Sequence, residues 1–309
     1  MTQSAKTMLR IGTRGSPLAL VQARMVQARL AAALGVDVGA IELATIRTSG
    51  DVIQDRPLAE EGGKGLFTKE IEEALLDGRI DLAVHSAKDM PTLLPQGLML
   101  AACLEREDAR DVFISRKAPS LDALPHGAAL GTTSPRRQAI AKRMRPDLRV
   151  VPLRGNVETR LRKLDEGQAD AIILALAGLK RLGLQAQATK VMSVEEFLPA
   201  AAQGAIGIEA REKDSRVRDM LARIDHAETS VAVACERIFL AELDGSCRTP
   251  IAGHATLSGR VLHFRGLIVK PDGSAAHETA VAGALENAAT IGADAGRALR
   301  QYAGPGFFD

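Results

Sequence analysis

Aromatic side chains are scarce in this chain of 309 residues, which has no Trp, one Tyr and seven Phe. Proteins that bind single-stranded nucleic acid stack the bases on aromatic rings. No Phe, Tyr or Trp occurs between Phe113 and Phe197, a stretch that contains the most basic part of the chain. This scarcity argues against nucleic acid as a partner.

Cysteine and long apolar runs are also rare. The three cysteines (Cys103, Cys235 and Cys247) are odd in number and far apart, so no disulfide framework is indicated. The chain has no CxxC or HExxH pattern and its six His are scattered, so we expect no metal site. Residues 1–10 lack the apolar core of a signal peptide, and no run of about 18 apolar residues occurs. We therefore expect a cytoplasmic protein that does not contact a membrane.

Arginine is abundant, with 29 Arg against 11 Lys, although the net charge is only +2. Guanidinium groups bind carboxylates and phosphates through paired donors. Ten basic and two acidic residues between Arg136 and Lys163 give that segment a net charge of +8, so the rest of the chain carries −6. The segment is typical of a pocket for a small polyanion.

Position within the expected elements separates these basic residues. Arg136 and Arg137 lie in the first turn of an expected helix, and Arg154 closes a strand beside Gly155. Open α/β sheets bind anions at helix N-termini and at the carboxyl ends of strands. We therefore expect these three to face a ligand. A solvated helix face is the expectation for Lys142, Arg143, Arg145, Arg162 and Lys163.

The first two thirds of the chain alternate short apolar runs with helical patterns, which indicates two α/β domains with parallel sheets covered by helices. Strands are predicted at 9–14, 41–47, 80–85, 112–115, 128–131, 150–153 and 171–176. Helices are predicted after Ser16, from Thr68, after Ser134 and after Asn156, where Ser and Asn provide caps. The last third predicts a small α+β domain: a helix at 225–243, strands at 251–257 and 261–269, and a helix at 285–302.

Three loops carry further candidates. Lys88 and Asp89 follow a buried strand, so they either point into a cleft or form a solvent-facing ion pair; His85 is expected to pack within the strand. The Gly-rich stretch 61–67 fails the phosphate-loop pattern and is expected to be a flexible lid carrying Lys64. Cys247 lies in a loop beside Arg248, which favours a thiolate, but no neighbouring His completes a catalytic pair. Core packing is the expectation for the other two cysteines.

Taken together, the motifs closely resemble the porphobilinogen deaminase family. The strings that carry the resemblance span nearly the whole chain: IGTRGSPLAL (11–20), RTSGD (47–51), GGKGLFTKEIE (62–72), AVHSAKDMPT (83–92), GTTSPRRQA (131–139), LRGNVETRLRKLD (153–165), ALAGLKRLGL (175–184), AAQGAIGIE (201–209) and DGSCRTP (244–250). The last reads Gly-Ser-Cys where many relatives have Gly-Gly-Cys, which keeps a small residue before the cysteine.

The resemblance implies an enzyme that joins four porphobilinogen molecules head to tail into hydroxymethylbilane and releases ammonia. It also implies a covalent dipyrromethane cofactor, held by a thioether to Cys247. Asp89 matches the family's catalytic aspartate, with Lys88 beside it, and the cofactor-binding residues would be Arg136, Arg137, Lys88 and Asp89. The implied substrate-binding residues are Arg14, Ser16, Arg154, Arg160, Arg181, Lys64, Phe67 and Gln203.

The resemblance further implies two periplasmic-binding-protein-like α/β lobes around a cleft and a smaller α+β C-terminal domain. The expected divisions are 1–104 with 204–223, 105–203, and 224–309, with a mobile loop within 47–65 and a monomeric state. Two alternatives remain open at this point: a bilobal anion-binding protein without catalysis, and a nucleic-acid-binding protein that uses the basic segment.

Overall fold

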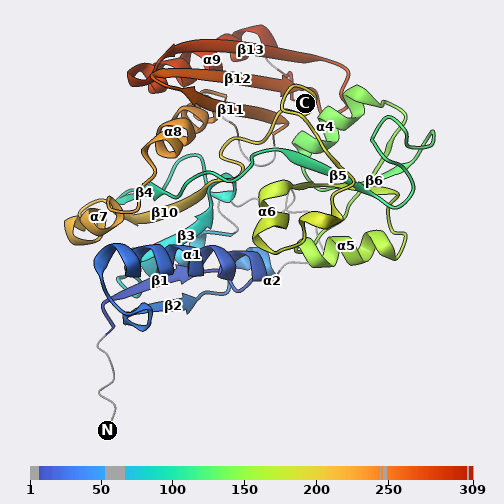
Figure 1. Cartoon of the computed structure of the whole chain (residues 1–309). Coiled ribbons are helices and arrows are strands. Elements are labelled where there is room, and N and C mark those ends of the chain that lie inside the picture. Colours follow the sequence, from blue (N-terminus) through green and yellow to red (C-terminus); the bar gives the residue numbers. More distant parts are fainter. Residues whose placement is uncertain (1–6, 53–66, 244, 246–248, 305, 309) are drawn as a thin grey trace. The chain divides into compact units, whose positions relative to one another are not determined.

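The computed structural model describes residues 7–52, 67–243, 245, 249–304 and 306–308 (Figure 1). Its contacts group into two compact units, one formed by residues 1–106 with 205–230 and the other by 107–204 with 231–309. Each unit is therefore built from two separate stretches of chain. Among the described residues, no helix is long and apolar enough to span a bilayer.

The first unit contains a five-stranded mixed sheet. Its strand order is β2–β1–β3–β10–β4. The strands are β1 (Leu9–Thr13), β2 (Ile41–Thr45), β3 (Leu82–Ser86), β4 (Leu98–Cys103) and β10 (Ile206–Arg211). The predicted parallel arrangement is correct for β1, β2 and β3. The prediction missed β4 and β10, and β10 lies between β3 and β4, antiparallel to both.

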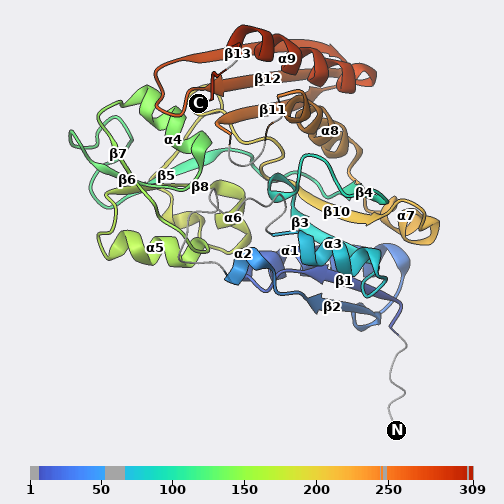
Figure 2. The same cartoon turned by 180° about the vertical axis from the view of Figure 1, so that it is seen from behind.

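Helices cover both faces of this sheet. The helices of the unit are α1 (Pro17–Leu34), α2 (Ser49–Val52), α3 (Lys69–Leu76) and α7 (Ser215–Leu221), with 3₁₀ turns η1 (Val38–Ala40) and η2 (Ala87–Asp89). The start and end of α1 are as predicted: Ser16 Oγ accepts a hydrogen bond from the Ala19 amide, and Gly35 ends the helix at φ +66°. Helix α1 packs on one face of the sheet, and α3 lies on the opposite face (Figures 1 and 2).

The second unit contains a sheet of the same kind, in the order β7–β6–β8–β5–β9. Its strands are β5 (Asp111–Ser115), β6 (Ala129–Gly131), β7 (Arg149–Val151), β8 (Ala171–Ala175) and β9 (Lys190–Val191). Its helices are α4 (Pro135–Met144), α5 (Val157–Asp165) and α6 (Leu176–Arg181), with the turn η3 (Gln185–Gln187). Ser134 and Asn156 cap α4 and α5 as predicted. Strand β5 is antiparallel to β8 and β9, so the parallel prediction is again only partly correct.

A three-stranded antiparallel sheet completes the second unit. It consists of β11 (Ile251–Ser258), β12 (Val261–Val269) and β13 (Ala276–Ala284), accompanied by α8 (Ala227–Glu242), η4 (Leu285–Asn287) and α9 (Ala288–Ala303). The rings of Phe239 and Phe264 lie 4.9 Å apart between centroids in its core. The prediction missed β13, because its sequence is rich in Ala and Gly and lacks the β-branched residues that favour strands.

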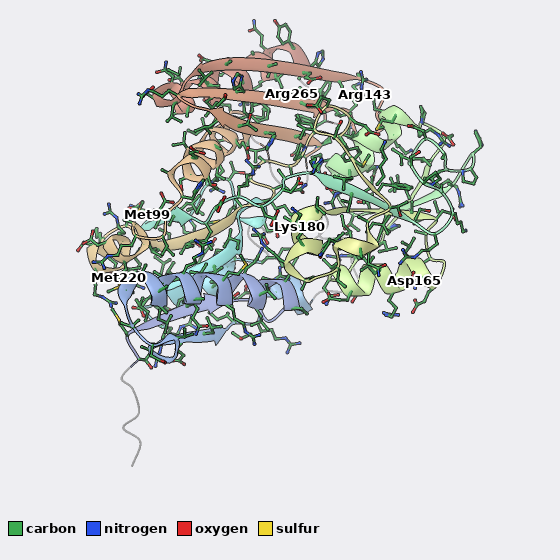
Figure 3. All side chains as sticks on the ribbon, viewed as in Figure 1. Met99, Arg143, Asp165, Lys180, Met220 and Arg265 are labelled. Carbon is green, nitrogen blue, oxygen red and sulfur yellow. The ribbon has the colours of Figure 1, made fainter. Side chains whose placement is uncertain are left out.

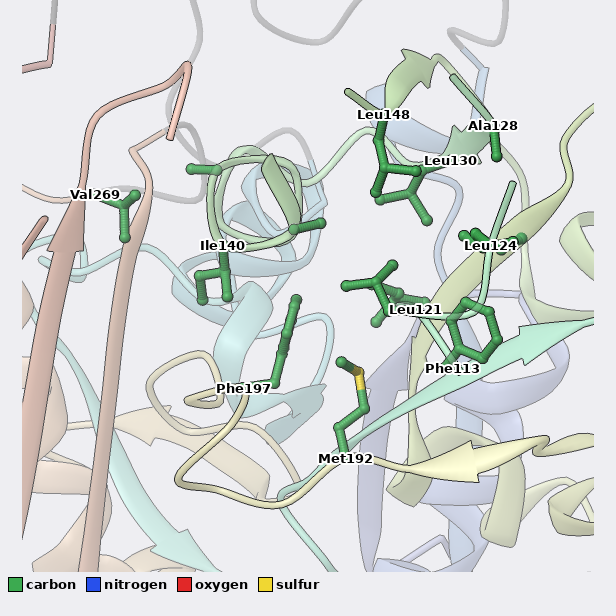
Figure 4. Close-up of a cluster of buried hydrophobic side chains, with 14 of the residues drawn as sticks. Phe113, Leu121, Leu124, Ala128, Leu130, Ile140, Leu148, Met192, Phe197 and Val269 are labelled. Atoms are coloured by element: carbon green, nitrogen blue, oxygen red, sulfur yellow. The ribbon is translucent and has the colours of Figure 1, made fainter. Parts of the chain in front are cut away.

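The two sheets of the second unit share a hydrophobic core. Phe113, Met192 and Phe197 pack in one cluster with Ile140 of α4 and Val269 of β12 (Figure 4). The predicted fold class is confirmed: two α/β lobes and a smaller α+β part. The boundaries of the three predicted domains stay a prediction. The contacts divide the chain into two units and group residues 107–204 with 231–309.

Gly204 ends the stretch that links β9 to β10, and its backbone requires glycine. It has φ +90°, and a Cβ atom there would lie 2.2 Å from the carbonyl oxygen of Glu107. We expect Gly204→Ala to lower the free energy of unfolding by at least about 2 kcal/mol, measured as a fall in thermal midpoint.

The matched control for this prediction is Gly183→Ala. Gly183 has φ +71° but nothing within 4 Å of the added Cβ atom, so it measures the cost of the left-handed conformation alone. That cost is about 1–2 kcal/mol. Equal effects at the two positions would contradict the backbone clash at Gly204.

Candidate functional site

A cavity of about 60 Å³ in the first unit lies at the carboxyl end of β3 and the N-terminus of α1. Four of the residues implied by the resemblance line it: Arg14, Ser16, Phe67 and Asp89. They come from the end of β1, the cap of α1, the segment before α3 and the turn η2. The structure therefore brings together residues that lie up to 75 positions apart in the sequence.

Cationic and acidic groups share this cavity. The Arg14 guanidinium lies 4.2 Å from the centroid of the Phe67 ring, which is a cation–π contact. Ser16 caps α1, whose free amide groups favour an anion. Asp89 is exposed and Lys88 half-buried, in the turn that follows β3 directly. The cavity can therefore hold an anionic group near Arg14 while it presents the Asp89 carboxylate to a cationic one.

A buried acid cluster lies behind this cavity. His85 Nε2 is 3.1 Å from Glu209 Oε2, and both side chains are almost fully buried. The expectation that His85 packs rather than faces solvent is confirmed, although it also lines the cavity wall. Burial raises the pKa of the Glu72 carboxyl on α3, and the neighbouring Glu209 raises it further. Sequence reasoning missed Glu209, although an acid within the apolar run of β10 was a usable signal.

The raised pKa of Glu72 predicts a pH-dependent gain from its neutral isostere. A buried acid whose pKa is higher in the folded state costs little stability below its unfolded pKa. The cost grows as pH rises toward the folded pKa and is complete above it. We therefore expect Glu72→Gln to raise the thermal midpoint more at pH 8 than at pH 5.

The exposed neighbour Glu73 provides the control for this prediction, since Glu73→Gln changes the same charge on the same helix without burial. We expect Glu73→Gln to give the same small change at both pH values. A Glu72→Gln effect that is smaller at pH 8 than at pH 5 would be inconsistent with a raised pKa in the folded protein.

Arg136 and Arg137 form a buried ion-pair cluster with Asp111 in the second unit. Arg136 Nη2 lies 2.7 Å from Asp111 Oδ2, while Arg137 Nε and Nη2 lie 3.0 and 2.8 Å from Asp111 Oδ1. Asp111 is fully buried, and the two arginines are 4% and 6% exposed. Burial lowers the pKa of Arg136, and Asp111 partly offsets this effect. Sequence reasoning missed Asp111, because an acid at a strand start carries no distinctive pattern.

Three other implied substrate-binding residues of the second unit donate hydrogen bonds to backbone carbonyls. Arg160 Nε donates to the Gly155 carbonyl at 2.8 Å. Arg181 Nη2 donates to the Gly204 carbonyl at 2.6 Å, and burial lowers the pKa of Arg181 to about 10. Gln203 is fully buried, and its Nε2 donates to the Ala109 carbonyl at 2.7 Å. Arg154 is half-buried in the segment between β7 and α5.

The prediction that five basic residues of this segment form a solvated helix face is only partly correct. Arg143 and Arg162 are exposed, as expected; Figure 3 labels Arg143 on α4 and Asp165 at the end of α5. The expectation is wrong for Arg145. Its Nε and Nη2 each donate to an Asp147 carboxylate oxygen at 2.7 Å, and its Nη1 donates to three backbone carbonyls of residues 121–124. Arg145 is therefore a structural residue that holds this loop.

Two implied residues, Cys247 and Lys64, lie outside the described residues, as does most of the expected mobile loop. The other two cysteines are buried as expected, and burial raises the pKa of Cys235 to about 12. No group of three or more His, Cys, Asp or Glu residues suited to a metal ion occurs in the part of the chain that the structure describes.

Two α/β lobes with cationic groups at helix N-termini and strand ends are suited to binding small anionic molecules. Family models agree with the motifs over almost the whole chain. Residues 9–219 match the model described as "Porphobilinogen deaminase, dipyromethane cofactor binding domain", and residues 230–301 match "Porphobilinogen deaminase, C-terminal domain". The chain belongs to the porphobilinogen deaminase family.

Curated relatives are similar over nearly their full length. The proteins named porphobilinogen deaminase from Nitrobacter hamburgensis and Nitrobacter winogradskyi are each 60% identical over 298 residues, which is 96% of this chain and 94% of the relative. The solved structures that match part of the chain include a nutrient-binding protein from Burkholderia cenocepacia bound to methionine. It is 17% identical with a TM-score of 0.44, and the match covers 70% of this chain and 90% of that one.

Proposed function

We propose that this protein is a hydroxymethylbilane synthase, which joins four porphobilinogen molecules head to tail and releases ammonia. The observation that carries the proposal is the family match across 9–219 and 230–301, together with the cavity that Asp89 and Arg14 line in the first unit. A bilobal anion-binding protein without catalysis has no such support. The chain would act as a monomer in the cytoplasm, without nucleic acid as a partner.

The residues of the chain fit the dipyrromethane cofactor that the family model names. Such a molecule carries several carboxylates, and the Arg136–Arg137–Asp111 cluster carries two guanidinium groups for one carboxylate. Arg136 Nε is buried with no hydrogen-bond partner among the described residues, so a donor remains for a further acceptor. Cys247 would hold the cofactor through a thioether, and Lys88, Asp89, Arg136 and Arg137 would contact it. When bound, the cofactor supplies the nucleophilic pyrrole carbon to which the first substrate is joined.

Each addition breaks the bond between carbon and nitrogen in one porphobilinogen, and the nitrogen leaves as ammonia. The cationic azafulvene that remains would react with the terminal pyrrole carbon of the growing polypyrrole, and that carbon would then lose its proton. Asp89 would stabilise the cation, because a fixed carboxylate facing the pyrrole N–H groups counters the positive charge. The arginines Arg14, Arg154, Arg160 and Arg181, with Ser16, Lys64, Phe67 and Gln203, would hold the acetate and propionate arms.

Product analysis tests the proposal directly. Purified protein incubated with porphobilinogen is expected to release four ammonia molecules for each hydroxymethylbilane formed. Binding of porphobilinogen without ammonia release would instead support the non-catalytic alternative.

A further inference from the structure

Asp111 is the shared counter-ion of two buried arginines at the start of one helix. Arg136 and Arg137 lie in the first turn of α4, where the helix dipole disfavours positive charge. Buried charges need partners, because transfer out of water is costly. Asp111, at the first position of β5, supplies one negative charge for both guanidinium groups. Counted over these three side chains, the cluster carries a surplus of one positive charge, at a helix end that also favours an anion.

The geometry of the cluster leaves specific donors available. Arg136 is held from three sides: Nη2 binds Asp111, Nη1 donates to the Leu198 carbonyl at 2.7 Å, and the group lies 5.6 Å from the centroid of the Phe197 ring. Its Nε has no partner among the described residues. Arg137 uses Nε and Nη2 for Asp111 and has no recorded bond from Nη1 within the described part of the chain. Among the described residues, each arginine thus keeps at least one nitrogen without a recorded hydrogen bond after Asp111 has fixed its position.

We propose that Asp111 is a positioning residue for cofactor loading, which holds Arg136 and Arg137 in place so that their surplus charge and remaining donors meet a cofactor carboxylate. The inference rests on the proposed function. Preorganised donors bind an anion more tightly than mobile ones, because no ordering is required when the anion arrives. Without Asp111, the two guanidinium groups repel each other and lose the carboxylate that orients both.

Intact-mass analysis of the purified holoenzyme tests the inference, with Asp111→Asn as the first variant. Asn keeps the size of the side chain and removes the charge. We expect the fraction of protein that carries two extra pyrrole units to fall at least about tenfold, provided that circular dichroism shows a folded protein. Asp111→Glu serves as the second variant, because it keeps the charge of the cluster unchanged but moves the carboxylate by one methylene. We expect it to fold and to show a smaller loss of loading, about threefold.

Asp147→Asn is the matched control. Asp147 is also the bidentate partner of an arginine in the same unit, Arg145, and that pair lies away from the cluster at the other end of α4. We expect this variant to lower the thermal midpoint while it keeps the wild-type fraction of adduct. A purely structural role for Asp111 would lower the midpoint in the same way without changing that fraction.

The outcomes separate the inference from the function on which it rests. Full loading in a folded Asp111→Asn or Asp111→Glu protein would overturn the positioning role and leave the proposed function standing. If Asp111→Asn does not fold, the loading of Asp111→Glu decides. A wild-type protein without the adduct would instead overturn the proposed function.

Discussion

Replacing Asp89 by Asn is expected to lower the turnover of porphobilinogen by about 10²–10³-fold, the typical cost of losing one electrostatic stabiliser of a transition state. The carboxylate of Asp89 is exposed in the turn η2 and lines the cavity with Arg14 and Ser16. Asn has the same shape, so the turn after β3 is expected to remain intact. The loss would therefore fall on kcat, since the missing charge acts on the cation that forms during the reaction.

Steady-state kinetics and intact mass together check this prediction. We expect Asp89→Asn to keep the adduct of two pyrrole units, which shows that the protein folds and loads its cofactor. Asp77→Asn is a suitable control, because Asp77 is an exposed acid at the end of α3 whose one recorded ion pair is with the exposed Arg79. Turnover by Asp89→Asn within threefold of the wild type would exclude the assigned role.

Replacing Cys247 by Ser is expected to abolish both the adduct and the turnover. A serine hydroxyl does not form the thioether, and neither of the other two cysteines can take its place. Cys103 and Cys235 are fully buried in the structure, and the pKa of about 12 keeps Cys235 as an unreactive thiol. We therefore expect the purified variant to have the mass of its sequence alone.

Cys235→Ala is the control for the cysteine prediction. Cys235 packs in the core of the small sheet with Phe239 and Ile291, so the variant is expected to lower the thermal midpoint and to keep the adduct. An adduct that persists in Cys247→Ser, or one that is lost in Cys235→Ala, would assign the attachment to a different residue.

Local signals in the sequence predicted much of the fold. Caps are short-range features, so Ser16, Ser134 and Asn156 begin their helices where the sequence places them. Strand β10 was missed, and its direction was not predictable in this way, because it depends on the path of a chain that enters another unit at residue 107 and returns at 205. Strand β13 was missed because its pairing with β12, and not its own composition, forms the strand.

The candidate site was predictable where function requires unusual residues at element ends. Arg14 and Asp89 lie where the motifs place them, at the carboxyl ends of β1 and β3. The partners of such residues were not predictable, because they are set by tertiary contacts. Asp111 reaches Arg136 across 25 positions and Glu209 reaches His85 across 124 positions. Both acids are fully buried, so their importance becomes visible only when the sheets are assembled.

The mass of the purified, unmodified protein shows whether it carries a covalent primer. We expect a single species that is heavier than the sequence by two pyrrole units, followed by a ladder of further additions when porphobilinogen is supplied. A catalytically active preparation with the bare sequence mass would contradict the covalent primer on Cys247.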